Sequence, residues 1–224
     1  MANATKDIPI LITAITSPES AGIVKTNERP ETNVTGTSDL VPVDKQIKLI
    51  KDLKPSTQRI GILYCSNEAN SAYQSEIAKS ETEKLGMHAK IYTVSASSEV
   101  PQVVQTMVNE VDFIYTTTDS VIASCMPTIS SIASPANVPI VCGETNGIYN
   151  GALATYGMDY YELGKITAKQ AKEILIDKKH PQSMPIKYLE NNKLLLNQSV
   201  LNEINMTVPD DLKILAEYIG INQN

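Results

Sequence analysis

The stretch Asp112-Phe113-Ile114-Tyr115-Thr116-Thr117-Thr118-Asp119-Ser120 is a short apolar run that changes abruptly into hydroxyl groups and one carboxylate. A continuous apolar run of this length is typical of a buried parallel strand. The polar residues precede a new helical pattern, and open α/β sheets bind ligands in loops at such positions. A second interpretation stays open, in which Thr118, Asp119 or Ser120 simply caps the following helix.

The segments around this stretch alternate between strand and helix patterns. Arg59–Cys65 and Val138–Cys142 are rich in β-branched residues, and residues 100–108 carry valines and Met107 at helical spacing. Such alternation predicts a parallel sheet with right-handed crossovers and helices on both faces. The fold class expected is therefore α/β. Other elements expected here are a helix opened by Pro42 and Asp44, a helix over 71–85, a strand over 89–94 and a helix over 121–133.

The two ends of the chain are less regular. Residues 7–15 predict a strand covered on both faces, whereas residues 33–39 are short and polar and predict a connector between two lobes. Residues 152–155 predict a short strand, and Asp159 is expected to cap a helix. In the tail we expect strands over 187–189 and 194–196, a helix over 199–204 and a helical turn starting at Asp210.

Charge and composition exclude several classes of partner. The chain has 224 residues, a net charge of -6 and a sequence pI near 5.0, which argues against nucleic acid and anionic membrane surfaces. No run is long enough to cross a bilayer, and residues 1–7 are polar with no secretory signal. As written, the chain is expected to stay in the cytoplasm or to have lost an export segment.

Four predicted strands end in polar loops of one type: Thr16-Ser17, Ser66-Asn67-Glu68, Thr118-Asp119-Ser120 and Glu144-Thr145-Asn146. Because the carboxyl ends of parallel strands point the same way, the last three loops are expected to meet at one edge of the sheet. Hydroxyls, amides and helix N-termini bind a carboxylate, while Asp119 and Glu144 are suited to an ammonium. The pattern predicts a site for a small zwitterion or a polyol.

Evidence for catalysis is weak. The sequence lacks the nucleophile-elbow, phosphate-loop, dinucleotide and zinc-protease motifs. Asp119 and Glu144 form a candidate carboxylate pair, but sequence does not place them at a working separation. Binding is therefore favoured over catalysis, with no catalytic residue, no metal and no cofactor expected.

Three motifs together resemble the ABC-transporter substrate-binding lipoproteins of the tryptophan/tyrosine-binding type: residues 33–43, residues 59–64 with 68–71, and residues 151–164. The resemblance covers residues 2–212. It implies a type I periplasmic-binding-protein fold of two lobes, lipid-anchored at the cell surface or in the periplasm. Such a protein closes an interlobe cleft on an aromatic amino acid or similar ligand and delivers it to ABC permease subunits. The candidate ligand-binding residues carried over are Thr16, Ser17, Thr35, Ser38, Asp39, Asn67, Asn70, Ser71, Thr118, Asp119, Glu144, Thr145, Asn146, Tyr156 and Asp159.

The chain departs from that family at its start, since it begins near the expected last strand of the first lobe. We therefore expect residues 1–37 and 152–183 to form a remnant of the first lobe. Residues 38–151 are expected to form a complete second lobe, while the lobe of residues 184–224 is left open. An incomplete lobe leaves an open strand edge at residues 8–15, which predicts edge exposure or a dimer through that edge. Loss of half the cleft is also expected to weaken ligand binding severely.

The sequence leaves three alternatives to solute binding open. The same fold serves as a cytoplasmic ligand-sensing or regulatory domain, and a truncated chain would be a fragment unable to bind ligand. An α/β enzyme that uses Asp119 and Glu144 ranks lowest.

Overall fold

The computed structural model describes residues 2–220, and the chain divides into two compact units. Of these described residues, unit 1 comprises 2–40 and 158–192, and unit 2 comprises 41–157 and 193–220. The observed divisions lie a few residues beyond the expected ones at 37 and 151. The tail from residue 184 is shared, because residues 184–192 belong to unit 1 and the rest to unit 2.

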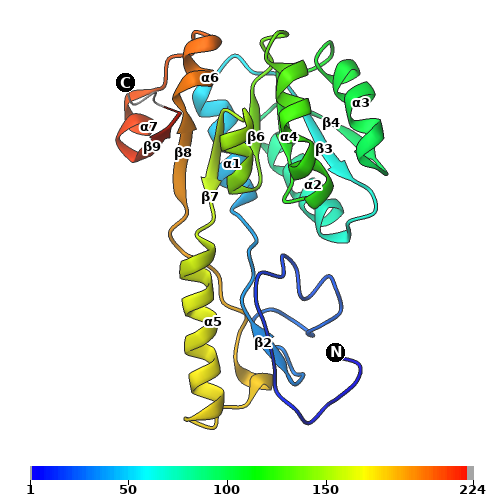
Figure 1. Ribbon diagram of the computed structural model, residues 1–224, viewed down its shortest axis with the longest axis vertical. Helices are drawn as coiled ribbons and strands as arrows, with labels where there is room; N and C mark the ends of the chain where they lie inside the picture. The colour runs from blue at the N-terminus through cyan, green and yellow to red at the C-terminus, as the bar shows by residue number, and fades with distance from the viewer. Residues whose placement is uncertain (1, 221–224) are drawn as a thin grey trace. The chain divides into compact units, whose positions relative to one another are not determined.

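Unit 2 is built on a sheet of seven strands in the order β4-β3-β5-β6-β7-β8-β9 (Figure 1). Neighbouring strands are parallel except for β7 and β8, which are antiparallel. The strands are β3 (Arg59–Cys65), β4 (His88–Val94), β5 (Phe113–Thr116), β6 (Ile140–Cys142), β7 (Ala154–Gly157), β8 (Lys193–Asn197) and β9 (Ala216–Ile219). The mostly parallel α/β sheet predicted from the sequence is confirmed.

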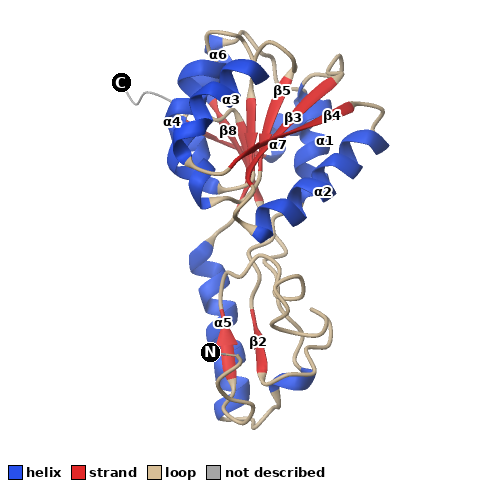
Figure 2. Ribbon diagram, turned by 90° about the vertical axis from the view of Figure 1, so that its right-hand side faces the viewer, coloured by secondary structure: helices blue, strands red, loops and turns tan. Residues whose placement is uncertain are grey.

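Helices cover both faces of this sheet (Figure 2). Ile47 and Ile50 of α1 pack with Phe113 and Tyr115 in one core cluster. Val104 of α3 belongs to a second cluster with Ile114 and Ile122. Alternate residues of β5 thus enter opposite clusters, as the alternation of side chains along a strand requires. The helices of unit 2 are α1 (Val43–Leu53), α2 (Ala69–Lys84), η1 (Ser97–Glu99), α3 (Val100–Met107), α4 (Ser120–Ala133), η2 (Thr145–Asn150), α6 (Gln198–Glu203) and α7 (Asp210–Leu215).

Two expectations for the end of the chain are wrong. Residues 187–189 form no strand, and only an isolated bridge joins Lys187 to Thr37. The expected strand after residue 152 is β7, but it lies inside the sheet of unit 2 rather than in a first-lobe remnant. Strand β9 was not expected at all. Its sequence, Ala-Glu-Tyr-Ile, is short and includes a charged residue, so it lacks the continuous apolar run that predicts a buried strand, and its residues are not fully buried.

Unit 1 contains the parallel pair β1 (Ile10–Ile12) and β2 (Val34–Gly36), together with α5 (Tyr160–Leu175) and η3 (Pro181–Ser183). The strand expected over residues 7–15 is shorter than predicted, and its side chains are only partly buried, so it is not covered on both faces. Residues 33–39 are not a mere connector, because β2 is fully buried. The one polar side chain of β2 is satisfied despite its burial, because Thr35 Oγ1 donates to the Met184 carbonyl at 2.7 Å.

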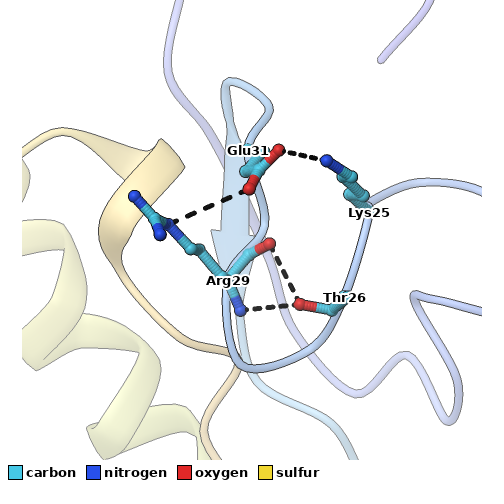
Figure 3. A network of polar contacts seen from close by, with 4 residues as sticks. All are labelled: Lys25, Thr26, Arg29 and Glu31. Carbon is cyan, nitrogen blue, oxygen red and sulfur yellow. Dashed lines mark hydrogen bonds and ion pairs between the residues drawn. The ribbon is translucent and has the colours of Figure 1, made fainter.

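A loop ahead of β2 is held by the polar network in Figure 3. Lys25 Nζ lies 2.6 Å from one oxygen of Glu31, and Arg29 Nε lies 3.9 Å from the other. Thr26 Oγ1 accepts from the Arg29 N–H at 2.9 Å and donates to the Arg29 carbonyl at 3.1 Å. The hydrogen bond and charge of Lys25 lower the pKa of Glu31. Exposed ion pairs contribute little to stability, so the network chiefly shapes the loop.

Candidate functional site

The candidate site in unit 2 lies where β3, β5 and β6 end. In the sheet, Leu63 is paired with Thr116, and Thr116 is paired with Cys142. The residues that follow these strands therefore emerge side by side at the carboxyl edge of the sheet. We call residues 66–68, 117–120 and 143–146 the rim.

Asp119 holds the rim together from inside. Its Oδ1 accepts from the Ile122 N–H at 2.9 Å, and its Oδ2 accepts from the Cys65 N–H at 2.7 Å. The residue is only 3% exposed. Asp119 is thus the N-cap of α4 and also ties that helix to the end of β3. Capping, one of the two interpretations left open by the sequence, accounts for Oδ1, and the link to β3 accounts for Oδ2.

A second carboxylate occupies the remaining donors at the start of α4. Both oxygens of Glu68 lie 3.1 Å from the Ser120 nitrogen, and Oε1 lies 3.3 Å from the Val121 nitrogen. The N-terminus of a helix favours negative charge because its first N–H groups lack partners within the helix. In this structure the protein itself supplies that charge, so this helix end is already occupied by Glu68.

The candidates at the start of α2 brace the loop after β5. Asn70 Nδ2 donates to the Thr118 carbonyl at 2.8 Å, and Ser71 Oγ donates to it at 3.3 Å. Gln74, which sequence reasoning missed, accepts from the Thr118 N–H at 3.1 Å. The signal that points to Gln74 is its place one helical turn after Asn70 and Ser71. Asn67 is tied instead to the Ser95 carbonyl, at 2.9 Å.

The loops after β5 and β6 approach each other closely. Gly143 N–H donates to the Thr116 carbonyl at 2.7 Å, and Thr118 Oγ1 donates to the Gly143 carbonyl at 3.0 Å. A Cβ on Gly143 would lie 2.7 Å from the Thr117 carbonyl carbon, so only glycine fits this contact without a backbone shift. The hydroxyl of Thr117 is buried without a hydrogen-bond partner among the described residues.

Glu144 differs from the other two rim carboxylates. Its Oε2 accepts from the Asn146 N–H at 2.6 Å, while no described residue hydrogen-bonds to its buried Oε1. Burial raises the pKa of Glu144 above its ordinary value, and the backbone amides of Asn146 and Gly147 offset this only in part. Thr145 and Asn146 follow directly in η2. The loop thus presents a carboxylate that the protein has not fully compensated.

Tyr156 lies in β7 and packs partly against the core cluster that contains α1. Burial raises its pKa, and the charges of Asp52 and Asp44 on α1 raise it further. Among the described residues 2–220, Tyr156 forms no hydrogen bond with a rim residue, and it lies against the core beside α1.

Within unit 1 the structure brings three candidates together. Thr16 Oγ1 donates to Asp39 Oδ1 at 2.8 Å, and Ser38 Oγ donates to the Thr16 carbonyl at 2.8 Å. The Tyr160 hydroxyl lies 3.4 Å from Asp39 Oδ2. Sequence reasoning missed Tyr160, although it directly follows the candidate Asp159.

The other candidates of unit 1 have separate local roles. Ser17 Oγ donates to Ser20 Oγ at 2.7 Å. Asp159 caps α5 by accepting from the Tyr161 and Glu162 N–H groups at 3.0 Å. The cap predicted from the sequence is confirmed. Thr35 is taken up by its bond to Met184 described above.

The chain is similar to known proteins. Residues 1–219 match the family model described as ABC transporter substrate binding protein. A curated relative, the "Tyrosine-binding protein" of Clostridioides difficile (strain R20291), is 37% identical over 204 residues, which are 91% of this chain and 59% of that protein. The chain therefore spans less than two thirds of the length of that relative.

Two solved structures are also similar. One is the ABC domain from Streptococcus pneumoniae in complex with L-Trp, with a TM-score of 0.88 and 34% identity over 97% of this chain and 73% of that one. The other is the ligand-free, open structure of a substrate-binding protein with adhesive properties from Clostridium difficile, with a TM-score of 0.80 and 37% identity over 97% and 72%. No helix among residues 2–220 has both the length and the apolar character needed to cross a membrane. From its sequence and its type I periplasmic-binding-protein fold, the chain belongs to the family of ABC transporter substrate-binding proteins.

Proposed function

We propose that the chain is the solute-binding component of an ABC uptake transporter, acting outside the cytoplasmic membrane and lipid-anchored there. We propose that its ligand is a small zwitterion such as an aromatic amino acid. The tyrosine and L-Trp named for two relatives support this class of ligand. ABC permease subunits are the partners that such a role requires. Unit 2 would then be the complete second lobe and unit 1 the part of the first lobe that this chain contains.

One observation carries the ligand assignment, namely the incomplete bonding of Glu144. Asp119 and Glu68 use their oxygens on backbone N–H groups, whereas Oε1 of Glu144 lacks a hydrogen bond from the described residues. A buried carboxylate oxygen without a donor is costly, and an ammonium group would supply both the donor and the missing positive charge. Glu144 as a residue is only partly buried, and we propose that its carboxylate turns to the open side of the rim when it meets the ammonium group of the ligand. We assign the amino group of the ligand to Glu144 rather than to Asp119.

The carboxylate of the ligand requires donors at the same rim. The first N–H groups of α4 are occupied by Glu68, so this helix end is not free for it. Thr117 is 1% exposed, its hydroxyl has no hydrogen-bond partner among the described residues, and its backbone lies against Gly143, the residue before Glu144. We propose that Thr117 and the side chain of Asn146 bind the carboxylate. In unit 1, Thr16, Ser38 and Asp39 remain candidates for the first-lobe contribution.

The substitution Glu144→Gln tests the ammonium assignment. It keeps the shape of the side chain but removes the charge, so we expect the affinity for tryptophan, tyrosine and phenylalanine to fall at least tenfold. The measurement is a titration of the chain with each amino acid. Binding is monitored by the backbone amide chemical shifts in NMR spectra, which detect millimolar affinities. Shifts are expected at residues 117–120 and 143–146.

A matched control is Glu76→Gln, because Glu76 is an exposed carboxylate of α2 outside the rim. The affinity of the Glu76→Gln variant for the three amino acids is expected to stay within twofold of that of the parent chain. Equal affinity of Glu144→Gln and the parent would overturn the role of Glu144. A failure of all three amino acids to shift any rim amide would overturn the proposed ligand class.

The raised pKa of Glu144 predicts a dependence on pH. Since the folded pKa lies above its ordinary value of 4.5, folding favours the protonated form. This contribution to stability is present below pH 4.5 and is lost as the pH rises through the raised pKa. We expect Glu144→Gln to lack that loss and to have a higher melting temperature than the parent at pH 7, with the difference vanishing at pH 4. Melting curves by circular dichroism at both values provide the test, and an equal difference at both would contradict it.

A further inference from the structure

Glu68 places its carboxylate at the start of a helix other than its own. It is the N-cap residue of α2, where its N–H donates to the Cys65 carbonyl at 3.1 Å and its carbonyl accepts from the Ser71 N–H at 3.1 Å. An N-cap side chain commonly bonds to the first turn of its own helix. The side chain of Glu68 makes no such bond and reaches instead to the Ser120 and Val121 N–H groups. Glu68 therefore serves the start of α4 and not that of α2.

Capping of α4 does not require this second carboxylate. Asp119 already occupies the N-cap position and accepts from the Ile122 N–H at 2.9 Å. Ser120 is exposed and Val121 is partly exposed, so water can satisfy their N–H groups, as it does at other helix ends. The charge of Glu68 is thus additional to what the helix needs, and it lies at a helix end that solutes can reach.

The charges of the rim are all negative. Its residues 66–68, 117–120 and 143–146 include Glu68, Asp119 and Glu144 but no lysine, arginine or histidine. Asp119 is 3% exposed and bonded to two backbone N–H groups, and Glu144 is the residue to which we assign the ammonium of the ligand. The N-terminus of an α-helix attracts anions. The carboxylate of Glu68 occupies the one place on the rim, the start of α4, where such an attraction would otherwise act.

We infer that Glu68 is a specificity-determining residue of the rim and that it excludes ligands with a second anionic group. Its carboxylate takes the donors that a further carboxylate or phosphate needs, and its charge repels that group. The rim then accepts zwitterions whose only anion is the α-carboxylate, and it rejects acidic amino acids. This inference rests on the proposed function, because it concerns the ligand of the same rim.

The first test compares L-glutamine with L-glutamate, which have nearly the same shape and differ by one negative charge. Both are short, so the side-chain group stays near the rim when the ammonium is bound to Glu144. We expect the parent chain to prefer glutamine at least tenfold in NMR titrations. Glu68→Gln keeps an acceptor oxygen without the charge, and it is expected to reduce this preference at least fivefold.

The preference is a ratio of two affinities, so a general loss of binding in a less stable variant does not imitate the effect. An unchanged ratio in Glu68→Gln would overturn the inference, and so would equal affinity of the parent for the two amino acids. A gain in affinity for both by the same factor would also contradict it, because Glu68 would then compete with the α-carboxylate that every amino acid carries.

The second test uses inorganic phosphate and does not depend on amino-acid binding. Glu68→Ala frees the Ser120 and Val121 N–H groups. We expect phosphate at up to about 50 mM to shift these two amides in the variant and not in the parent. Phosphate is also expected to raise the melting temperature of Glu68→Ala above its value in NaCl of equal ionic strength, since a ligand of the folded state stabilises it. No phosphate shift at these amides in Glu68→Ala would overturn the inference.

The matched controls are Glu76→Gln and Glu76→Ala, because Glu76 is an exposed carboxylate of α2 outside the rim. We expect neither to gain phosphate binding or to change the glutamine preference by more than twofold. An equal effect at Glu76 would reduce the result to a change in net charge and overturn the role of Glu68. The two tests also separate this inference from the proposed function. If no amino acid binds the parent, the proposed ligand class fails, and the phosphate result alone decides whether Glu68 closes the end of α4 to anions.

Discussion

The substitution Gly36→Ala is expected to disrupt the β1–β2 pair of unit 1. Gly36 has a φ of +146°, a conformation that residues with a side chain rarely adopt. A Cβ at this position would lie 1.9 Å from the Ile12 carbonyl oxygen and 2.7 Å from the Ile12 nitrogen. Both atoms belong to the backbone of the paired strand, so no side-chain rotation relieves the overlap. We expect a loss of about 3 kcal/mol or more in the stability of unit 1.

Hydrogen exchange measured by mass spectrometry locates this effect. Peptides covering residues 8–15 and 33–39 are expected to exchange much faster in Gly36→Ala, while peptides of β3 and β5 in unit 2 stay protected. Gly164→Ala is the matched control in the same unit. A Cβ there meets no atom within 4 Å, and alanine in a helix interior stabilises it by up to about 1 kcal/mol. Unchanged protection of β1 in Gly36→Ala would contradict the close approach of the two strands.

The substitution Asp119→Ala is expected to be the most damaging single change in unit 2. It removes the acceptor for the Cys65 and Ile122 N–H groups and leaves both buried. Each lost partner of a buried donor costs about 1 to 3 kcal/mol, and the loss of an N-cap lies in the same range. We expect a total of about 3 kcal/mol in the free energy of unfolding, measured by urea denaturation. Asp119→Asn keeps one acceptor oxygen and is expected to lose about half as much.

The control for this prediction is Glu76→Ala, which removes an exposed carboxylate from the same unit and is expected to change stability by less than about 0.5 kcal/mol. The result also separates the two roles considered for Asp119. If Asp119 is structural, Asp119→Ala loses stability together with any loss of ligand binding. If Asp119→Ala loses binding but keeps normal stability, Asp119 contacts the ligand directly.

The central sheet could be predicted from sequence because its strands are continuous apolar runs separated by helical patterns. Strand β3 begins and ends where expected, and β5 is buried as its composition indicates. The polar character of the loops after β3, β5 and β6 was also visible. The hydrogen bonds between those loops could not be predicted, because a bond such as that from the Cys65 N–H to Asp119 joins positions far apart in the chain.

Unit 1 was harder to predict for a physical reason. The strand β2 has no hydrophobic alternation, and it is buried because the Thr35 hydroxyl finds a carbonyl at Met184. That partner lies almost at the other end of the chain, so no local window of sequence contains both. The incomplete bonding of Glu144 could not be predicted from the residue type either. It depends on which donors lie near Oε1, and none of the described residues supplies one.

The antiparallel step between β7 and β8 has a consequence for the order of folding. The chain leaves the sheet after Gly157 and returns at Lys193. The residues between these two points, 158–192, include α5 and belong to unit 1. Closing so long an excursion costs entropy before the pairing of Ala154 with Leu196 repays it. The crossover from β3 to β5 is longer still, but its residues belong to the same unit as the sheet, whereas residues 158–192 belong to unit 1; β9 can pair only after β8 is in place. We therefore expect β8 and β9 to join the sheet late in folding, because their pairing depends on residues 158–192 of unit 1.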